Sequence, residues 1–353
     1  MDSSFEVEHS KMSDQQFSQD AGGVLNAGQT LLGARREPQA RFARYVWGVL
    51  VYNLVVILWG AYVRVSFSGD GCGAHWPTCG NAFASAMTNA PKIEGLHRLS
   101  TGVVIPLVIV QLVLAFRLFP KGHGARAGSV ACFAFTFSEA LIGAVLVLYK
   151  LVAHNPSAYR ALADSMHLIN TFLLIASLVL TAWWSEGKPP LRLRGQGAVV
   201  PALATLLIAS LFVGVSGHIA ALGDMLFPSS TLIEGIRADF SPTGSFLQHL
   251  RPYHPFLSVA LGIYAILLSR TIARQRPDLQ SPQFARYCVW LFVIQIAAGF
   301  LNLFLNAPIW MQIVHLFFAD LLWINLVLLS AAALGQSLAV PSVKPLGNEV
   351  PVS

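Results

Sequence analysis

Four histidines lie near the ends of apolar stretches that are long enough to cross a membrane. They stand in the segments EGLHRLSTG (His97), DSMHLINTF (His167), RPYHPFLSV (His254) and QIVHLFFAD (His315). A neutral imidazole is a poor group to expose to lipid, but its ring nitrogen is a good axial ligand for haem iron. Ionisable residues at membrane depth are candidates for functional sites. Two such histidines in each half of the chain therefore predict two haem sites with paired histidine ligands.

The composition predicts a polytopic membrane protein rather than a soluble domain. The chain has 353 residues, of which 55% are hydrophobic and 11% charged, and its mean hydropathy is +0.59. Eight stretches are long enough to span a hydrocarbon layer of about 30 Å. We expect them at residues 45–66, 95–116, 129–149, 161–184, 198–219, 253–270, 287–306 and 309–333.

Basic residues near the ends of these stretches predict the orientation. Fourteen lie on one side: Arg35, Arg36, Arg41, Arg44, Arg117, Lys121, Arg126, Lys188, Arg192, Arg194, Arg270, Arg274, Arg276 and Arg286. Seven lie on the other: Arg64, Lys92, Arg98, Lys150, Arg160, Arg237 and Arg251. The excess predicts that both termini are cytoplasmic and that all four histidines lie toward the outer side. Nucleic-acid binding is not expected, because the basic residues are dispersed over short loops.

The ends of the chain are polar and are expected to be cytoplasmic tails at 1–44 and 334–353. The first 44 residues contain acids and no apolar core, so they fit neither a cleaved signal nor a mitochondrial transit peptide. We therefore expect a disordered N-terminal tail and a bacterial inner membrane as the setting.

The two halves of the apolar region follow one pattern, which predicts an internal repeat. The end of the first stretch, GAYVRVSFSG from Gly60, aligns with GVSGHIAALG from Gly214 at the end of the fifth. Glu139 in the third stretch corresponds to Gln295 in the seventh, and MHL in the fourth to VHL in the eighth.

We expect an all-α protein whose eight transmembrane helices form two pseudo-symmetric four-helix bundles. The bundles would cover 45–184 and 198–333, joined by a cytoplasmic linker at 185–197, and each would hold its own histidine pair. The glycines Gly60, Gly143, Gly214 and Gly299 would allow close approach of a helix or a flat ring.

Cysteines divide into two classes. Cys132 and Cys288 lie in apolar stretches and are expected to be small buried side chains. Cys72 and Cys79 share the outer loop GDGCGAHWPTCGN, where an oxidising compartment favours a disulfide. A metal site that adds His75 is the minor alternative, because it supplies only three ligands.

The sequence allows more than one role for the polar residues near the four histidines. Glu94 lies one helical turn before His97, where it either acts on a bound group and passes protons, or is a first-turn acid paired with Arg98. Arg98 and Arg251 are candidates to bind haem propionates. His249 competes with His254 as a ligand, and we prefer His254 because it lies closer to the apolar run.

In this order, the motifs GCGAHWPTCG, EGLHR, MHLIN, RPYHP and IVHLFFAD resemble the haem A synthase family over about residues 45–333. The resemblance implies oxidation of a ring methyl group of haem O to a formyl group, which gives haem A for a terminal oxidase. It implies that His97 and His167 flank the substrate haem with Glu94 as the catalytic group. It further implies that His254 and His315 hold a permanent haem b, and that Cys72 and Cys79 are the family's loop pair.

Some positions depart from the family pattern, and other functions stay open. His75 stands where an acid is common, Glu139 where glutamine is expected, and RPYHP does not repeat the His-Arg of EGLHR. The alternative is a di-haem cytochrome b that only transfers electrons, and a transporter is disfavoured by the parallel repeat. Expected partners are haem O, haem A, a haem O synthase, an unidentified electron donor and the lipid bilayer, and a homo-oligomer is left open.

Overall fold

The fold is a bundle of long helices connected by short loops. The computed structural model describes residues 37–81, 88–277 and 280–335, and this part of the chain contains no β-strand. Eight helices are long and apolar enough to cross a membrane: Glu37–Val65, α3 (Ala90–Leu118), α4 (Gly124–Leu148), α5 (Ala158–Ser185), α6 (Val199–Leu226), α9 (Tyr253–Gln275), α10 (Ser281–Phe304) and α11 (Ile309–Leu334). The predicted all-α membrane architecture is therefore confirmed.

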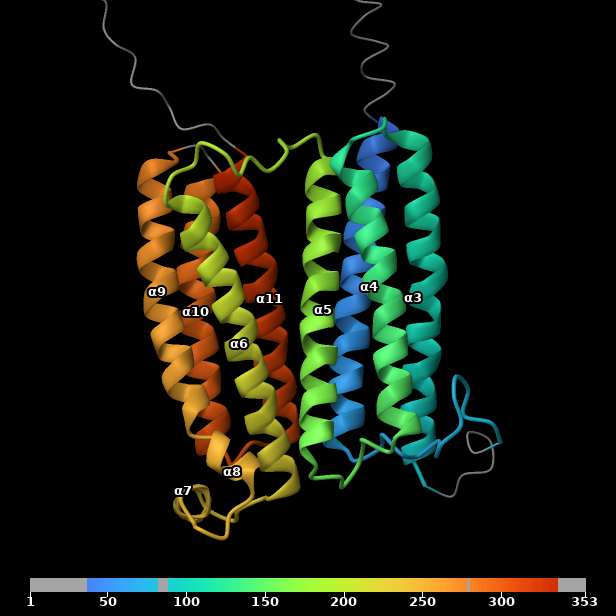
Figure 1. Ribbon diagram of the computed structural model, residues 1–353, viewed down its shortest axis with the longest axis vertical. Helices are drawn as coiled ribbons and strands as arrows, with labels where there is room; N and C mark the ends of the chain where they lie inside the picture. The colour runs from blue at the N-terminus through green and yellow to red at the C-terminus, as the bar shows by residue number, and fades with distance from the viewer. Residues whose placement is uncertain (1–36, 82–87, 278–279, 336–353) are drawn as a thin grey trace, which may run out of the picture.

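The long helices stand in two groups, side by side (Figure 1). Glu37–Val65, α3, α4 and α5 form one group, and α6, α9, α10 and α11 form the other. Glu37 and Leu334 lie at the same end of the molecule, as an even number of crossings requires. The expected division of the chain into two bundles and their pseudo-symmetry stay predictions.

Several helices are longer than the sequence expectation, and the first and sixth crossings are examples. The first helix begins at Glu37, so residues 37–44 are helical and do not belong to an irregular tail. Its extra turns carry an ion pair between Arg41 and Glu37 at 2.6 Å, four residues apart on one face. The sixth crossing extends to Gln275 rather than ending at 270. The remaining tails, 1–36 and 336–353, lie outside the described residues.

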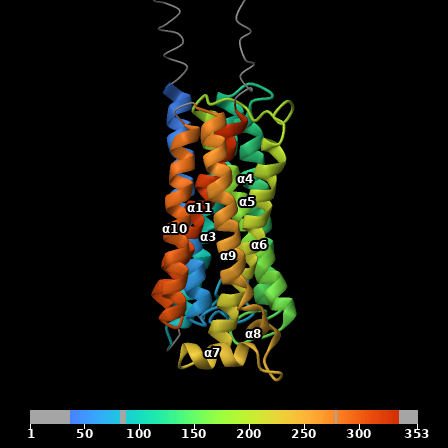
Figure 2. The same ribbon diagram turned by 90° about the vertical axis from the view of Figure 1, so that its left-hand side faces the viewer.

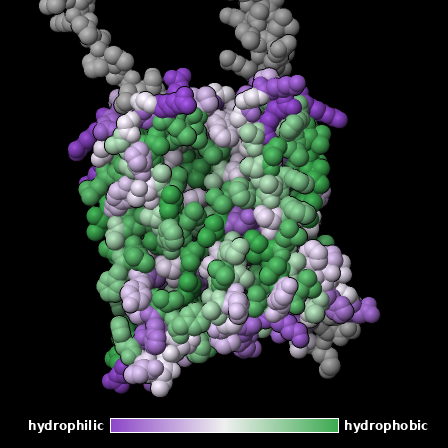
Figure 3. All heavy atoms as spheres, viewed as in Figure 1, coloured by the Kyte–Doolittle hydropathy of each residue, from purple (hydrophilic) through white to green (hydrophobic). Residues whose placement is uncertain are grey.

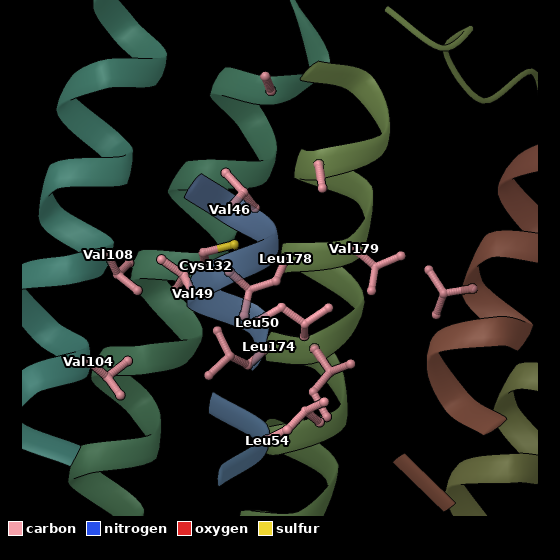
Figure 4. Packing of buried hydrophobic residues seen from close by; sticks show 14 of the residues in the cluster. Val46, Val49, Leu50, Leu54, Val104, Val108, Cys132, Leu174, Leu178 and Val179 are labelled. Atoms are coloured by element: carbon pink, nitrogen blue, oxygen red, sulfur yellow. The ribbon is translucent and has the colours of Figure 1, made fainter. Parts of the chain in front are cut away.

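Each group has an apolar core made by small and branched side chains. In the first group this core includes Val46, Leu50, Val108, Cys132 and Leu178, which meet between the four helices (Figure 4). Both unpaired cysteines, Cys132 and Cys288, are fully buried, as expected. Large apolar side chains also cover the outside of the helices, and Figure 3 shows them as a belt between two polar ends. Such a belt fits a hydrocarbon layer, so the chain is a multi-pass membrane protein.

Contacts of α5 with α6 and α11 join the two groups. In the middle of the interface the Trp323 ring stacks on Phe172 with centroids 5.3 Å apart, and its Nε1 donates to the Phe172 carbonyl at 2.7 Å. This bond satisfies the indole N–H, which finds no water inside a bilayer. The contact fixes the depth of α11 relative to α5.

The end of the molecule opposite Glu37 carries the longest connections. Two short helices, α7 (Leu232–Asp239) and α8 (Phe246–Leu250), lie in the connection between α6 and α9, and α7 runs across the bundle end (Figure 2). Arg251 binds this connection to the bundle through Asp224 of α6 at 2.9 Å and through Asp239 of α7. Buried ion pairs of this kind hold an irregular segment in one place because a lone buried charge would be costly.

The fold predicts on which sides the loops lie. A single cysteine introduced at Lys121 should react with a membrane-impermeant maleimide from one side, and a cysteine at Tyr159, which is 77% exposed, from the opposite side. The reason is that α4 crosses the membrane between them. Labelling of intact and permeabilised cells measures this, and the native thiols of Cys132 and Cys288 give little background because they are buried. Labelling of both positions from one side would contradict the fold.

Candidate functional site

His254 and His315 face each other between α9 and α11 in the second group. Their ring centroids are 6.4 Å apart and the ring planes are nearly perpendicular, at 86°. Two imidazoles that bind one metal atom from opposite sides, with bonds of about 2 Å, have centroids roughly 6 Å apart. The spacing therefore suits two axial ligands of a single iron atom.

Neighbouring polar groups orient both rings of this pair. The Ser216 hydroxyl lies 3.0 Å from Nδ1 of His254, and the Gln295 side-chain amide lies 3.3 Å from Nε2 of His315. A ligand imidazole ordinarily uses its second nitrogen in such a contact, which fixes the ring. The Nδ1 atom of His315 is buried and has no hydrogen-bond partner.

Glycines make room for these rings on the adjacent helices. A Cβ atom added at Gly217 would lie 2.6 Å from Cε1 of His254, and one added at Gly299 would lie 3.1 Å from Cε1 of His315. In the first group, a Cβ atom at Gly60 would lie 2.9 Å from Cε1 of His97. Three of the four histidines thus pack directly against a glycine backbone.

This packing corrects one part of the predicted repeat. The residue that corresponds to Gly60 by its contact is Gly217, not Gly214, whose added Cβ atom would instead meet Phe172. A Cβ atom added at Gly143 would meet no atom of another described residue within 4 Å, so no helix packs closely against this glycine. The alignment of the first stretch with the fifth therefore shifts by three residues, which is nearly one helical turn.

The first group brings His97 of α3 and His167 of α5 within electrostatic range of each other. The Nδ1 atoms of both are buried without a hydrogen-bond partner. Glu139 of α4 lies beside His167, with 3.4 Å between its Oε1 and the ring Nδ1, and accepts hydrogen bonds from Asn170 and Thr171. Glu139 and Gln295, which occupy aligned positions in the sequence, thus each contact a histidine of their own half.

The donor set fits a haem iron better than a bare metal ion. Within the described ranges, no group of three or more His, Cys, Asp and Glu side chains could hold a metal ion. A porphyrin supplies four equatorial nitrogens and needs only one or two protein ligands. Unpartnered imidazole nitrogens beside glycine backbones meet that need in both halves.

Glu94 is a buried residue that fastens the outer loop to α3. Its side chain pairs with Arg98 at 2.5 Å, and its second oxygen accepts the Cys72 N–H at 2.7 Å. Cys72 forms a disulfide with Cys79, as predicted, and Arg98 also donates to the carbonyls of His75 and Thr78. The alternative of a solvated first-turn acid is wrong on two points, because α3 begins at Ala90, before Glu94, and Glu94 is 3% exposed. Its pairing with Arg98 is as expected.

The two arginines that the sequence indicated as candidates to bind haem propionates are both paired with carboxylates of the protein. Arg98 binds Glu94, and Arg251 binds Asp224 and Asp239. The sequence could not show the partners of Arg251, because they are 12 and 27 residues away and are brought together by the fold of the outer connection.

The other described histidines have different partners. His249 of α8 has its Nε2 2.9 Å from the Ser241 carbonyl, and the choice of His254 as ligand stays a prediction. His123 caps α4, where its Nδ1 accepts the Ala125 N–H, and His154 stacks on Phe67. His218 contacts Arg64 and Asp164, a charged group that the sequence did not predict. The sequence feature that could have revealed this group is the presence of Arg64 and Asp164 inside membrane-length helices.

Known proteins place the chain in a family. The COX15-CtaA family, described as cytochrome oxidase assembly protein, matches residues 85–327. Two strains of Thermus thermophilus have a protoheme IX farnesyltransferase that is 44% identical over 299 residues, which is 84% of this chain and 49% of the relative. A heme A synthase of Symbiobacterium thermophilum is 28% identical over 261 residues, covering 70% of this chain and 80% of the relative. A heme A synthase of Bacillus pumilus is 35% identical over 138 residues, covering 38% of this chain and 44% of the relative.

The fold and the histidine pairs define a helical membrane protein with sites suited to haem. The matched residues cover more than half of the chain, and it belongs to the COX15-CtaA family of cytochrome oxidase assembly proteins. The chain spans about half the length of the Thermus relatives that it matches.

The contacts of Glu94 predict how firmly the disulfide loop is held. Glu94→Ala removes the acceptor of the Cys72 N–H, and a hydrogen bond to a charged group contributes about 1.5–3 kcal/mol. Reduction of the Cys72–Cys79 bond by dithiothreitol should therefore become roughly tenfold faster or more, as measured by thiol alkylation. Lys92→Ala, an exposed change in the same turn, should leave the rate unchanged. Equal rates in wild type and Glu94→Ala would show that Glu94 does not fasten the loop.

Proposed function

We propose that the chain is a haem A synthase, which oxidises a ring methyl group of haem O to a formyl group and so supplies haem A to a terminal oxidase. Membership of a cytochrome oxidase assembly family supports this proposal, as do relatives named heme A synthase. The observation that carries it is the asymmetry between the two histidine pairs.

The position one turn before the α3 and α9 histidines shows this asymmetry. It is Glu94 before His97, where the carboxylate is buried against the disulfide loop. In the second half it is Arg251 before His254, where the arginine is neutralised by two aspartates. An electron carrier with two equivalent haems needs no such difference, whereas an enzyme needs a reactive group at one site only.

The roles follow from this difference. His97 and His167 hold the substrate haem in the first half, and Glu94 is the catalytic group beside it. His254 and His315 hold a resident haem b in the second half, where their facing rings are already spaced for one iron. When bound, haem b supplies one-electron transfer.

Residues of the first half would position the substrate and handle protons. Conversion of a methyl to a formyl group is a four-electron oxidation. Written with water as the oxygen source, it releases four protons and four electrons, so it needs a proton acceptor near the ring edge and an oxidant from outside the chain. Glu94 is held for this role by Arg98 and by the Cys72 N–H, which fix both carboxylate oxygens. The apolar outer surfaces of the helices let a farnesyl chain extend into the bilayer.

We place the protein in a bacterial inner membrane with both termini in the cytoplasm. The bias of Lys and Arg toward the Glu37 end of the bundle supports this orientation. The histidine sites and the disulfide loop then lie toward the periplasmic side, where disulfides form.

A haem O synthase is the partner that must supply the substrate. The Thermus relatives are named protoheme IX farnesyltransferase, and about half of their length lies outside the match with this chain. A farnesyltransferase acting on protohaem makes a farnesylated haem, which is the class of substrate proposed here. The reaction also needs an electron-transfer partner of the membrane, and a homo-oligomer stays an open expectation.

Substitution of one histidine from each pair tests the division of labour. His315→Ala should lower the content of bound low-spin haem b more than about tenfold, because an axial ligand is lost. His97→Ala should abolish haem A formation while haem b stays bound. Haem extraction and chromatography from membranes that contain each variant, with an absorption spectrum of the purified protein, measure both.

Glu94→Gln separates catalysis from loop positioning, because the amide oxygen can still accept the Cys72 N–H. Haem O, or a partly oxidised form, should accumulate while the haem b spectrum and the disulfide stay as in wild type. Normal haem A formation by Glu94→Gln would contradict the catalytic role. Equal loss of haem b from His97→Ala and His315→Ala would favour the alternative, a di-haem cytochrome b.

A further inference from the structure

A charged cluster joins the two helix groups near their outer ends. Nη1 of Arg64, in the first helix, lies 2.9 Å from Nδ1 of His218 in α6. Asp164 of α5 lies 3.5 Å from Nε2 of His218 and 3.5 Å from Nε of Arg160. Charges inside membrane-length helices are costly, so such a cluster is a candidate for a functional site.

The cluster carries a surplus positive charge. Nη1 of Arg64 lies within hydrogen-bond distance of both ring nitrogens of His218, at 2.9 Å and 3.4 Å. Asp164 is the one carboxylate among the described residues of this group, and it faces the two arginines Arg64 and Arg160. One positive charge in this partly buried group has no carboxylate to balance it.

Arg64 is the member of the cluster with free binding capacity. Arg160 is committed to Asp164 and to the carbonyls of Ala153 and Asn155. Arg64 uses Nη1 for His218, and no described residue accepts a hydrogen bond from its Nε or Nη2. A planar guanidinium with donors to spare suits a carboxylate ligand.

The position of Arg64 places its unused hydrogen-bond donors beside the first histidine pair. Gly60, one turn before Arg64, packs against the His97 ring. Asp164, which belongs to the same cluster, lies one turn before His167 on α5. The cluster thus borders both histidines of the first half at their outer side.

The second half has no equivalent arginine. Gly217 packs against His254 as Gly60 packs against His97, and the residue four positions after Gly217 is Ala221. Arg98 and Arg251 have carboxylate partners of their own. Unlike these two arginines, Arg64 combines a place beside a histidine pair with unused donors.

We propose that Arg64 binds a propionate carboxylate of the haem held by His97 and His167, an inference that rests on the proposed function. The carboxylate neutralises the surplus charge of the cluster. Such a contact would place the propionate edge of the ring on the side of the charged cluster. Arg64 is a substrate-positioning residue in this account.

Titration of the purified full chain with two porphyrins tests the proposal. Haemin has free propionates, and haemin dimethyl ester has the same ring without their charge. Absorption of the histidine-ligated form gives the dissociation constant of each, and the His97→Ala variant identifies the binding phase that belongs to the first half. Arg64→Gln, Arg64→Lys and Arg237→Gln are compared, the last being an exposed arginine of α7 near the same membrane surface.

Arg64→Gln should weaken first-half binding of haemin roughly tenfold to a hundredfold and leave binding of the dimethyl ester unchanged. Arg64→Lys should fall between Arg64→Gln and wild type, and Arg237→Gln should match wild type. Unchanged haemin affinity in Arg64→Gln, or equal losses for haemin and its ester, would overturn the proposal and leave the proposed function standing. Failure of the wild type to bind either porphyrin would overturn both.

Discussion

Polar side chains inside a bilayer must find partners within the protein, because the hydrocarbon offers no water. This constraint is most visible around the four imidazoles, whose ring nitrogens are not all hydrogen-bonded to other protein groups. Glycines bring the neighbouring backbones against the rings of His97, His254 and His315, and Glu139 and Gln295 touch the remaining ring edges. The nitrogens left without partners are the feature that an iron atom would complete.

The same constraint explains why the two halves differ at the end of the bundle that carries the disulfide loop. In the first half, Glu94 is buried only because Arg98 and the Cys72 N–H satisfy it, and this arrangement ties a disulfide loop to the helix that carries His97. In the second half, Arg251 is used to fasten α7 instead. One half therefore has a buried carboxylate one turn before its α3 histidine, and the other has an arginine paired with two aspartates in the same place.

Much of this structure could be predicted from the sequence, because membrane helices are visible in hydropathy alone. The eight crossings, the pairing of His254 with His315 across one bundle, and the loop disulfide follow from apolar length, repeat order and compartment. The glycine register could not be predicted, since Gly214 and Gly217 lie nearly one turn apart and only packing selects between them. The partners of Arg251 and the charged cluster of Arg64 are also products of tertiary structure, which brings distant residues together.

In the proposed function, one histidine pair holds a haem that is being modified and the other holds a resident haem b. Extraction of the haems from the purified wild-type protein, with identification by mass spectrometry, tests it most directly. The account predicts haem b together with a farnesylated haem, either haem O or its oxidised products. Haem b as the only porphyrin in both sites, or no porphyrin at all, would contradict it.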